Sequence, residues 1–148
     1  DRTVLSVPAG RIRRIAALRR DGSRCAAVRP GAALTWETES PAGAYVAADV
    51  LDAWLTRFAD LKAGHVLRDA PVSPDKLRPY GLDRPLVRLT LDLDGGEDGL
   101  RRVLLIGDPD PKTGAAPALV QGRPVLYELD AETVRLLLRW PMKEEQTK

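Results

Sequence analysis

The residues of this chain that could perform chemistry lie in two short motifs. Ser73-Pro-Asp-Lys76 fits the S-x-x-K spacing of penicillin-recognising enzymes, and Lys112-Thr113-Gly114 fits their K-T-G element. In such enzymes the serine is a nucleophile at the start of a core helix. Here a helix cap before a proline explains Ser73 fully, the K-T-G run lies in a proline-rich loop, and the accompanying S-D-N element is missing. A serine hydrolase using Ser73 and Lys76 is therefore kept only as an alternative.

Metal and acid–base chemistry has little support in the sequence. Carboxylates gather around 92–98 and 108–110, but the calcium-loop pattern D-x-D-x-[DN]-G-x5-E is not met, and solvated hairpin charges explain them. His65 is the single histidine and Cys25 the single cysteine. The sequence therefore excludes a multi-histidine site, a thiolate cluster and an internal disulfide within one chain. We expect no metal, no cofactor and no catalytic residue.

Arginines near the N-terminus form the most usable surface feature. The first 30 residues carry eight arginines against two aspartates, although the whole chain has a net charge of only +2. Such a patch could meet an acidic protein or an anionic membrane surface, while scattered solvated arginines are the commoner cause. With only three Trp, three Tyr and one Phe, nucleic acid is not an expected partner. The expected patch consists of Arg11, Arg13, Arg19, Arg20 and Arg24.

Length and composition predict one globular domain. With 148 residues, of which 44% are hydrophobic and 30% charged, the chain can bury a core without disulfides or metals. No apolar run approaches the roughly 20 residues that span a bilayer, and no signal peptide is recognisable. We expect a single α+β domain over residues 1–141 and a flexible tail over 142–148.

Two amphipathic helices are expected. The first, over 48–62, repeats apolar residues at helical spacing and has Asp49 and Asp52 in its first turn, where the helix dipole favours acids. The second begins after Asp130, a good N-cap, and ends before Pro141, which cannot continue a helix.

Strands are expected between these helices. Residues 85–94 alternate apolar and polar side chains strictly, which is typical of a half-buried strand. A glycine-rich turn over 95–99 joins this strand to a partner over 100–107. A second hairpin is expected on either side of 121–123.

A comparison of the two halves decides the ambiguous segment 11–20, whose apolar residues also fit a helix. IRRI at 12–15 resembles LVRL at 86–89, and both lead through an Asp-Gly turn into another apolar segment. Each half then closes with a helix opened by an aspartate. We predict two degenerate β-β-β-α units over about 4–65 and 84–140, each an antiparallel strand group covered by one helix and perhaps joined in one sheet. Coincidence in an alanine- and leucine-rich chain is the alternative.

The segment 66–83 is expected to link the two units, and its special residues have backbone roles. A single helical turn comes first, and Pro79 ends it. Gly81 completes a tight turn, which lets Leu82 fold back onto Leu77. No nucleophile–base pair is needed to explain these residues.

Several of these pieces together resemble the bacterial domain of unknown function DUF4340, from about Val4 to Pro141. The resemblance rests on a tryptophan-then-proline segment, an amphipathic helix, "YGLDRP" running into the alternating strand, and the later "VLLIGDP". The residues that carry it are Trp36, Pro41, Tyr80, Gly81, Leu82, Pro85 and Gly107. In the expected fold, Trp36 lies on the third strand of the first unit and Pro41 ends that strand.

The resemblance implies a location and partners but no chemistry. Such domains resemble parts of membrane-anchored cell-envelope proteins, often encoded with ABC-transporter components and including some linked to gliding motility. The family supplies no enzymatic activity and no catalytic residue. We expect a non-catalytic interaction or accessory module outside the cytoplasm, anchored through a segment absent from this chain, with a protein partner such as a transporter-associated complex. A small-ligand or lipid-binding domain with a cavity between helix and sheet is the alternative.

Overall fold

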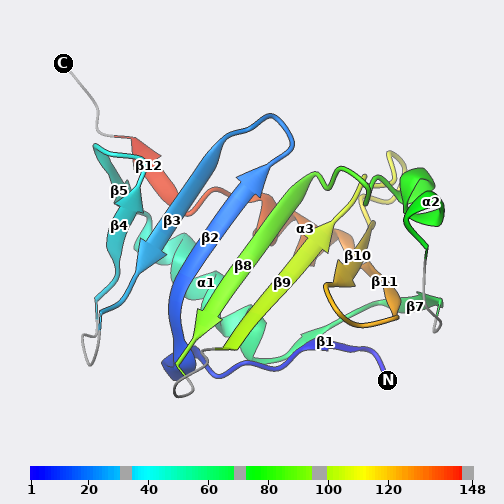
Figure 1. Cartoon of the computed structure of the whole chain (residues 1–148), viewed down its shortest axis with the longest axis horizontal. Helices are drawn as coiled ribbons and strands as arrows, with labels where there is room; N and C mark the ends of the chain where they lie inside the picture. Colours follow the sequence, from blue (N-terminus) through cyan, green and yellow to red (C-terminus); the bar gives the residue numbers. More distant parts are fainter. Residues whose placement is uncertain (31–34, 69–72, 95–99, 145–148) are drawn as a thin grey trace.

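The computed structural model describes residues 1–30, 35–68, 73–94 and 100–144, and an eight-stranded antiparallel sheet forms its centre. The strands follow the order β4-β3-β2-β8-β9-β10-β11-β7 across the sheet (Figure 1). Their bounds are β2 (Ile12–Arg19), β3 (Arg24–Val28), β4 (Glu37–Ser40), β7 (His65–Arg68), β8 (Val87–Leu93), β9 (Leu100–Ile106), β10 (Ala116–Val120) and β11 (Leu126–Leu129). The predicted α+β class is confirmed, and the two strand groups join in one sheet where β2 pairs with β8.

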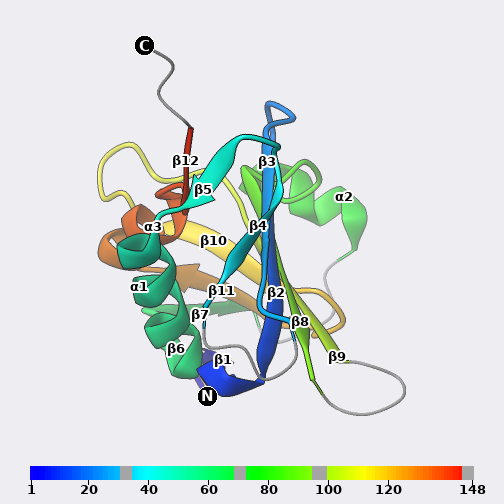
Figure 2. The same cartoon turned by 90° about the vertical axis from the view of Figure 1, so that its left-hand side faces the viewer.

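Helices cover the two faces of this sheet unequally. The helices α1 (Ala48–Ala59) and α3 (Ala131–Leu138) lie on one face, whereas the single turn α2 (Pro74–Leu77) lies on the other (Figure 2). We call these the helix face and the outer face. Two 3-10 turns, η1 (Ala9–Arg11) and η2 (Arg78–Tyr80), precede β2 and follow α2.

Two short strand pairs tie distant parts of the chain together. One joins β1 (Thr3–Leu5) to β6 (Leu61–Lys62), and the other joins β12 (Met142–Glu144) to β5 (Ala44–Val46). The predicted hairpins β8–β9 and β10–β11 are present as antiparallel pairs. The turn expected over 95–99 lies outside the described residues.

The helix α1 ends earlier than the sequence predicts, whereas α3 ends before Pro141 as predicted. α1 stops at Ala59 rather than Lys62, because Leu61 is fully buried in the strand pair with β1. α3 stops at Leu138, and Arg139 after it already has an extended backbone.

Three other expectations are corrected. Residues 142–144 form β12 instead of a flexible tail, because Met142 is buried in the core and its strand pairs with β5. The expected linker 66–83 contributes β7 to the large sheet. Trp36 lies just before β4 rather than on it, while Pro41 follows the last residue of β4 as predicted.

A bulge explains why β2 imitates the spacing of a helix. Ile12 and Ile15 are both buried, although a regular strand would place residues three apart on opposite faces. The register with β8 shifts between Ile12 and Arg14, and such an extra residue returns Ile15 to the helix face. Beyond the bulge, Ala17 is buried and Leu18 is exposed, as alternation requires. The segment is therefore a strand, as the comparison of the two halves predicts.

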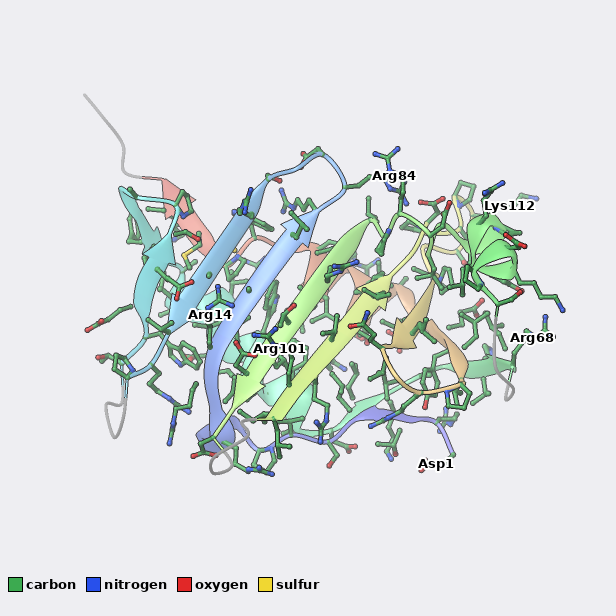
Figure 3. The ribbon with its side chains drawn as sticks, viewed as in Figure 1. Asp1, Arg14, Arg68, Arg84, Arg101 and Lys112 are labelled. Atoms are coloured by element: carbon green, nitrogen blue, oxygen red, sulfur yellow. The ribbon has the colours of Figure 1, made fainter. Side chains whose placement is uncertain are left out.

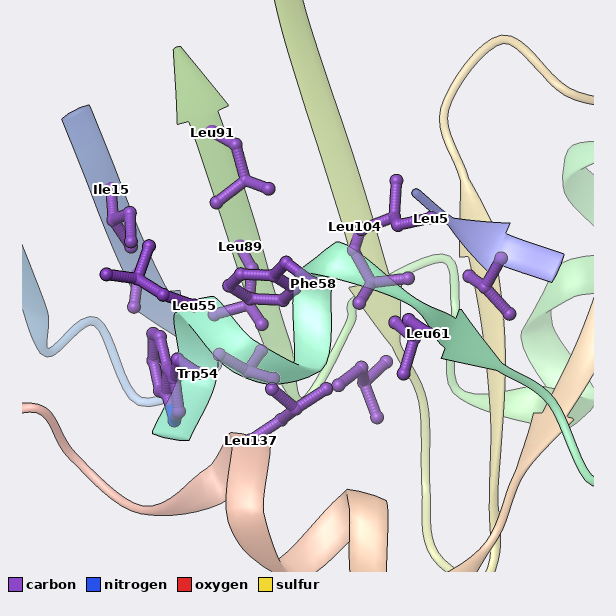
Figure 4. Packing of buried hydrophobic residues seen from close by; sticks show 14 of the residues in the cluster. Leu5, Ile15, Trp54, Leu55, Phe58, Leu61, Leu89, Leu91, Leu104 and Leu137 are labelled. Carbon is purple, nitrogen blue, oxygen red and sulfur yellow. The ribbon is translucent and has the colours of Figure 1, made fainter. Parts of the chain in front are cut away.

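The main core fills the space between the helix face and α1 with α3. Trp54 and Phe58 are fully buried and meet edge to face, with ring centroids 6.2 Å apart. Trp54 Nε1 donates a hydrogen bond to the Leu136 carbonyl at 2.9 Å, which joins the two helices. Figure 4 shows the sheet residues that pack against these rings, among them Ile15, Leu89, Leu91 and Leu104.

The outer face carries a smaller apolar cluster on its β9–β11 side. Leu82, Leu105 and Leu126 are its buried members. The partly buried residues that pack against them are Leu77, Tyr80, Val103 and Leu119. The cluster is thus covered by the segment that contains α2 and η2.

The two halves place their elements in the same order. From the centre outward, β2, β3 and β4 follow one another on one side, and β8, β9 and β10 on the other. Then β5 precedes α1 and β11 precedes α3. The second strand after α1, β7, pairs with β11 of the other half, and the strand after α3, β12, pairs with β5. The two-unit repeat itself stays a prediction, because element order alone does not establish that the halves are related.

Candidate functional site

The segment around Gly81, which follows η2, and the segment around Gly107, which follows β9, pack against each other. Gly81 closes η2 with a φ of 72°, and the Leu82 amide donates to the Leu77 carbonyl at 3.1 Å. These contacts confirm the predicted turn and the return of Leu82 onto Leu77. Gly107 lies directly against the backbone of Tyr80, so that a Cβ at Gly107 would overlap the Tyr80 carbonyl oxygen.

Arg20 joins these motifs to the tip of the β2–β3 hairpin. Its guanidinium donates to Asp108 Oδ1 at 2.6 Å, to the Arg84 carbonyl at 2.8 Å and to the Gly81 carbonyl at 3.3 Å. The three acceptors come from two segments that are distant from Arg20 in sequence. The Arg20 side chain therefore fixes how the hairpin lies against the rest of the fold.

A cleft of about 580 Å³ opens beside this joint. The β2–β3 hairpin, the segment before β8 and the end of α3 form its walls. The lining residues are Arg19, Arg20, Asp21, Arg84, Leu86 and Leu138. A smaller hollow of about 250 Å³ shares Arg19, Arg20 and Arg84 with the cleft. Figure 3 shows Arg84 at the edge of the sheet where β8 begins.

The charged side chains of the cleft differ in how they are held. The guanidinium of Arg19 lies 4.0 Å from the centre of the Trp140 ring and donates to the Leu138 carbonyl at 3.1 Å. The Asp21 carboxylate accepts the amide and the hydroxyl of Ser23 at 2.8 and 2.6 Å, and the hydroxyl contact lowers the pKa of Asp21 below its ordinary value. Arg84 is exposed, and its guanidinium pairs with no residue in the part of the chain that the structure describes.

The five arginines of the expected patch lie in two groups. Arg11 lies just before β2 and Arg13 near its start, where both contact Asp94, at 3.5 and 3.0 Å. Arg13 and Arg19 are six residues apart on the strand, which at about 3.3 Å per residue separates them by roughly 20 Å. The group at the far end consists of Arg19, Arg20 and Arg24. Only that second group borders the cleft and its neighbouring hollows.

The motifs with catalytic spacing are not brought together. Ser73 directly precedes α2 and Lys76 lies in it, on the outer face. The Ser73 side chain makes no cap hydrogen bond, so the predicted side-chain cap is wrong, although Ser73 does occupy the N-cap position. Lys112 lies in the loop that ends at Gly114, and Gly114 packs against Ala131 at the start of α3. Figure 2 shows this loop on the helix face, with the sheet between it and α2.

The remaining reactive side chains have ordinary structural positions. His65 is exposed on β7. Cys25 is buried on β3, and burial raises the pKa of its thiol to about 11, which keeps it neutral. Asp92 accepts a hydrogen bond from Arg101 at 2.6 Å instead of facing an open cation site. Within the described residues, no three His, Cys, Asp or Glu side chains form a group that could hold a metal ion.

Comparison with known proteins decides the family. The family model described as "Domain of unknown function (DUF4340)" matches residues 36–141, which is more than half of the chain. This chain belongs to the DUF4340 family. The DUF4340 match includes all the residues on which the resemblance rests, from Trp36 to Gly107, and it starts after β3. No curated protein and no solved structure matches the chain.

The cleft of this DUF4340 domain has no counterpart in the sequence motifs. Arg84 and Leu86 flank Pro85, which is one of the residues that carry the family resemblance, and Leu138 is the last residue of α3. Their convergence depends on the pairing of β2 with β8 and on the path of α3. The one feature of the sequence that could have indicated this cleft is Arg84, a charged residue close to the "YGL" turn. None of the helices in the described residues is long and apolar enough to cross a membrane.

Proposed function

We propose that this DUF4340 domain is a non-catalytic interaction module of a membrane-anchored cell-envelope or transporter-associated protein. The observation that carries the proposal is the position of α2, with Ser73 and Lys76, on one face of the sheet and of the β9–β10 loop, which contains Lys112, on the other (Figure 2). Acyl transfer of the kind that these motifs perform requires the serine, its lysine base and the K-T-G element around one substrate, and groups on opposite faces of a sheet cannot contact one substrate together. The envelope context and the protein partner come from the family resemblance.

Covalent labelling tests the absence of catalysis. Purified domain is incubated with a fluorescent penicillin, next to a Ser73→Ala variant and heat-denatured protein. Ser73 is exposed, so its replacement leaves the fold intact. We expect equal background labelling in all three samples. Time-dependent labelling that disappears in Ser73→Ala would contradict the proposal and favour the serine hydrolase.

The location is tested on the full-length protein in its own cells. Protease added to spheroplasts should degrade the domain while cytoplasmic proteins stay intact. A domain that is degraded only after the cells are lysed would place it in the cytoplasm and remove the envelope part of the proposal.

A second candidate function, a small-ligand or lipid-binding domain, is favoured by the cleft. Its volume of about 580 Å³ lies inside the range of roughly 300–1,000 Å³ that small-molecule sites occupy. It also lies where the end of a helix meets the sheet. A ligand that binds the folded state raises the melting temperature as its concentration rises, which a thermal-shift screen measures. If no ligand raised the melting temperature, the small-ligand function would be rejected and the interaction module would be the remaining proposal.

A further inference from the structure

We infer that the cleft takes an amphiphilic anion, an alkyl chain that ends in a carboxylate or a phosphate. The inference rests on the proposed small-ligand function and names the class of molecule that this site would bind. Arg84 would hold the anionic group, and the walls formed by Leu86 and Leu138 would contact the chain. Each part of the assignment follows from how the lining side chains are already engaged.

The walls of the cleft are mostly apolar in spite of three arginines. Leu86 and Leu138 are only partly buried, so each leaves apolar surface for a ligand. The Arg19 guanidinium is held against Trp140, and the Arg20 guanidinium is held by Asp108 and two carbonyls. What these two residues offer the cleft is therefore their methylene stems. A hydrocarbon chain fits such walls, because it gains roughly 25 cal/mol per Å² of buried apolar surface.

One arginine of the cleft has a guanidinium available for a ligand. Arg84 makes no ion pair and no side-chain hydrogen bond within the described residues. A guanidinium binds carboxylates and phosphates through two parallel hydrogen bonds. The anionic end of a ligand placed at Arg84 also lies between the cleft and the smaller hollow, which contributes Arg88.

The acids near the cleft do not cancel this positive charge. Asp108 balances Arg20 across a 2.6 Å contact, and Asp83 lies 3.6 Å from Arg78. Asp21 is the one carboxylate in the lining, and its oxygen is turned to Ser23 by two hydrogen bonds. Arg19 and Arg84 contribute two positive charges to the lining and Asp21 only one negative charge, so the local potential favours an anion over a cation.

Isothermal titration calorimetry of the purified domain tests the ligand class with four probes. Octanoate and octyl phosphate carry both the chain and the charge, octanol carries the chain alone, and acetate carries the charge alone. We expect one-to-one binding of octanoate or octyl phosphate, at least tenfold weaker binding of octanol, and no measurable heat with acetate. Which of the two charged probes binds better distinguishes a carboxylate ligand from a phosphate ligand.

Two variants separate the charge from the chain. Arg84→Gln removes the charge at an exposed position, and we expect octanoate binding to weaken about 10-fold or more, since hydrogen bonds to charged groups contribute about 1.5–3 kcal/mol. Octanol binding should not change in that variant. Leu138→Gln should weaken both probes. Arg68→Gln is the matched control, because Arg68 is also exposed but lies on β7 at the far edge of the sheet (Figure 3).

The outcomes distinguish this inference from the function on which it rests. Equal binding of octanol and octanoate, or unchanged octanoate binding in Arg84→Gln, overturns the anionic class while the cleft remains a ligand site. Acetate binding as tight as octanoate binding indicates a charged surface for an acidic protein and overturns the amphiphile. If no alkyl probe binds, the inference fails, and the small-ligand function is then judged by the thermal-shift screen alone.

Discussion

The two faces of the eight-stranded sheet are stabilised by different kinds of contact. On the helix face, α1 and α3 bury a continuous core around Trp54 and Phe58. On the outer face, one side holds a small leucine cluster under η2, and the other side carries ion pairs between partly exposed side chains. The helix face should therefore supply most of the stability. The outer face and the adjoining ends of its strands carry the hydrogen bonds of Arg20 to Gly81, Arg84 and Asp108, and the cleft lies beside them.

The ion pairs of the outer face lie across neighbouring strands. Two nitrogens of Arg14 donate to Glu39 Oε2 at 2.9 and 2.6 Å, and Arg101 donates to Asp92 at 2.6 Å. The Arg14 hydrogen bond lowers the pKa of the Glu39 carboxyl below its ordinary value. Because water reaches these pairs, each contributes far less than a buried leucine on the opposite face.

The largest effect on stability is expected from a matched pair of truncations, one on each face of the sheet. Leu89→Ala removes a fully buried side chain from the helix face, and Leu105→Ala removes a nearly buried one from the outer face. We expect losses of about 4 and about 2 kcal/mol in the free energy of unfolding, within the range of 2–5 kcal/mol for such changes. Urea denaturation measures both. Equal losses would show that the two faces contribute alike.

A substitution at Gly107 tests how tightly the segment that contains α2 and η2 packs against the sheet. A Cβ there would overlap the Tyr80 carbonyl, so Gly107→Ala must push η2 off the sheet. We expect a loss of about 1–3 kcal/mol, as for other overpacked sites. Gly10→Ala is the control, because nothing lies within 4 Å of an added Cβ. If Gly107→Ala left the free energy of unfolding unchanged, the segment with α2 and η2 would be packed only loosely against the sheet.

The cap of α3 is a smaller contribution on the helix face. Asp130 Oδ1 accepts the Thr133 amide at 2.8 Å, as predicted, and Asp130→Ala should cost about 1 kcal/mol. The same hydrogen bond lowers the pKa of Asp130 from its ordinary value of 3.8. Its stabilisation is therefore complete above that value and is lost as the pH falls through the folded-state pKa.

The check is a urea titration of wild-type and Asp130→Ala protein at several pH values. The difference in stability should be constant at neutral pH and shrink below pH 3.8. Asp52→Ala, which removes an exposed acid from the first turns of α1, should show a smaller difference. A difference that does not depend on pH would contradict the assignment of the cap to the carboxylate.

The smallest effect is expected from the outer ion pair between Arg14 and Glu39. A double-mutant cycle with Arg14→Gln and Glu39→Gln should give a coupling below about 1 kcal/mol, reduced further in 1 M salt. Because the pKa of Glu39 is lowered, this coupling is present above its ordinary value of 4.5 and disappears as the pH falls through the folded-state value. A coupling that survives 1 M salt would require a drier outer face than the structure has.

The elements that the sequence predicts well are those with local signals. The alternation of β8, the Asp130 cap and the return of Leu82 onto Leu77 each depend on residues within one short segment. The strand β12 has no such signal, since three residues after Pro141 show no period, and only pairing with β5 orders them. The two isoleucines of β2 imitate a helix because a bulge separates them.

The cleft could not be predicted for the same reason. Arg11 and Arg19 are close in sequence, but they lie at opposite ends of β2, Arg11 just before its first residue and Arg19 as its last. Arg19, Arg84 and Leu138 are distant in sequence, and only the pairing of β2 with β8 and the packing of α3 bring them together. Chemical type alone therefore placed in one patch arginines that the length of β2 separates.

The pairing of β2 with β8 has a practical consequence for anyone who clones this domain. A fragment restricted to residues 36–141 would omit β2 and β3 and would also lack β12. Its truncated sheet would present the bare hydrogen-bonding edge of β8, which invites intermolecular pairing and precipitation. Expression trials should therefore start at the first strand and continue through Glu144.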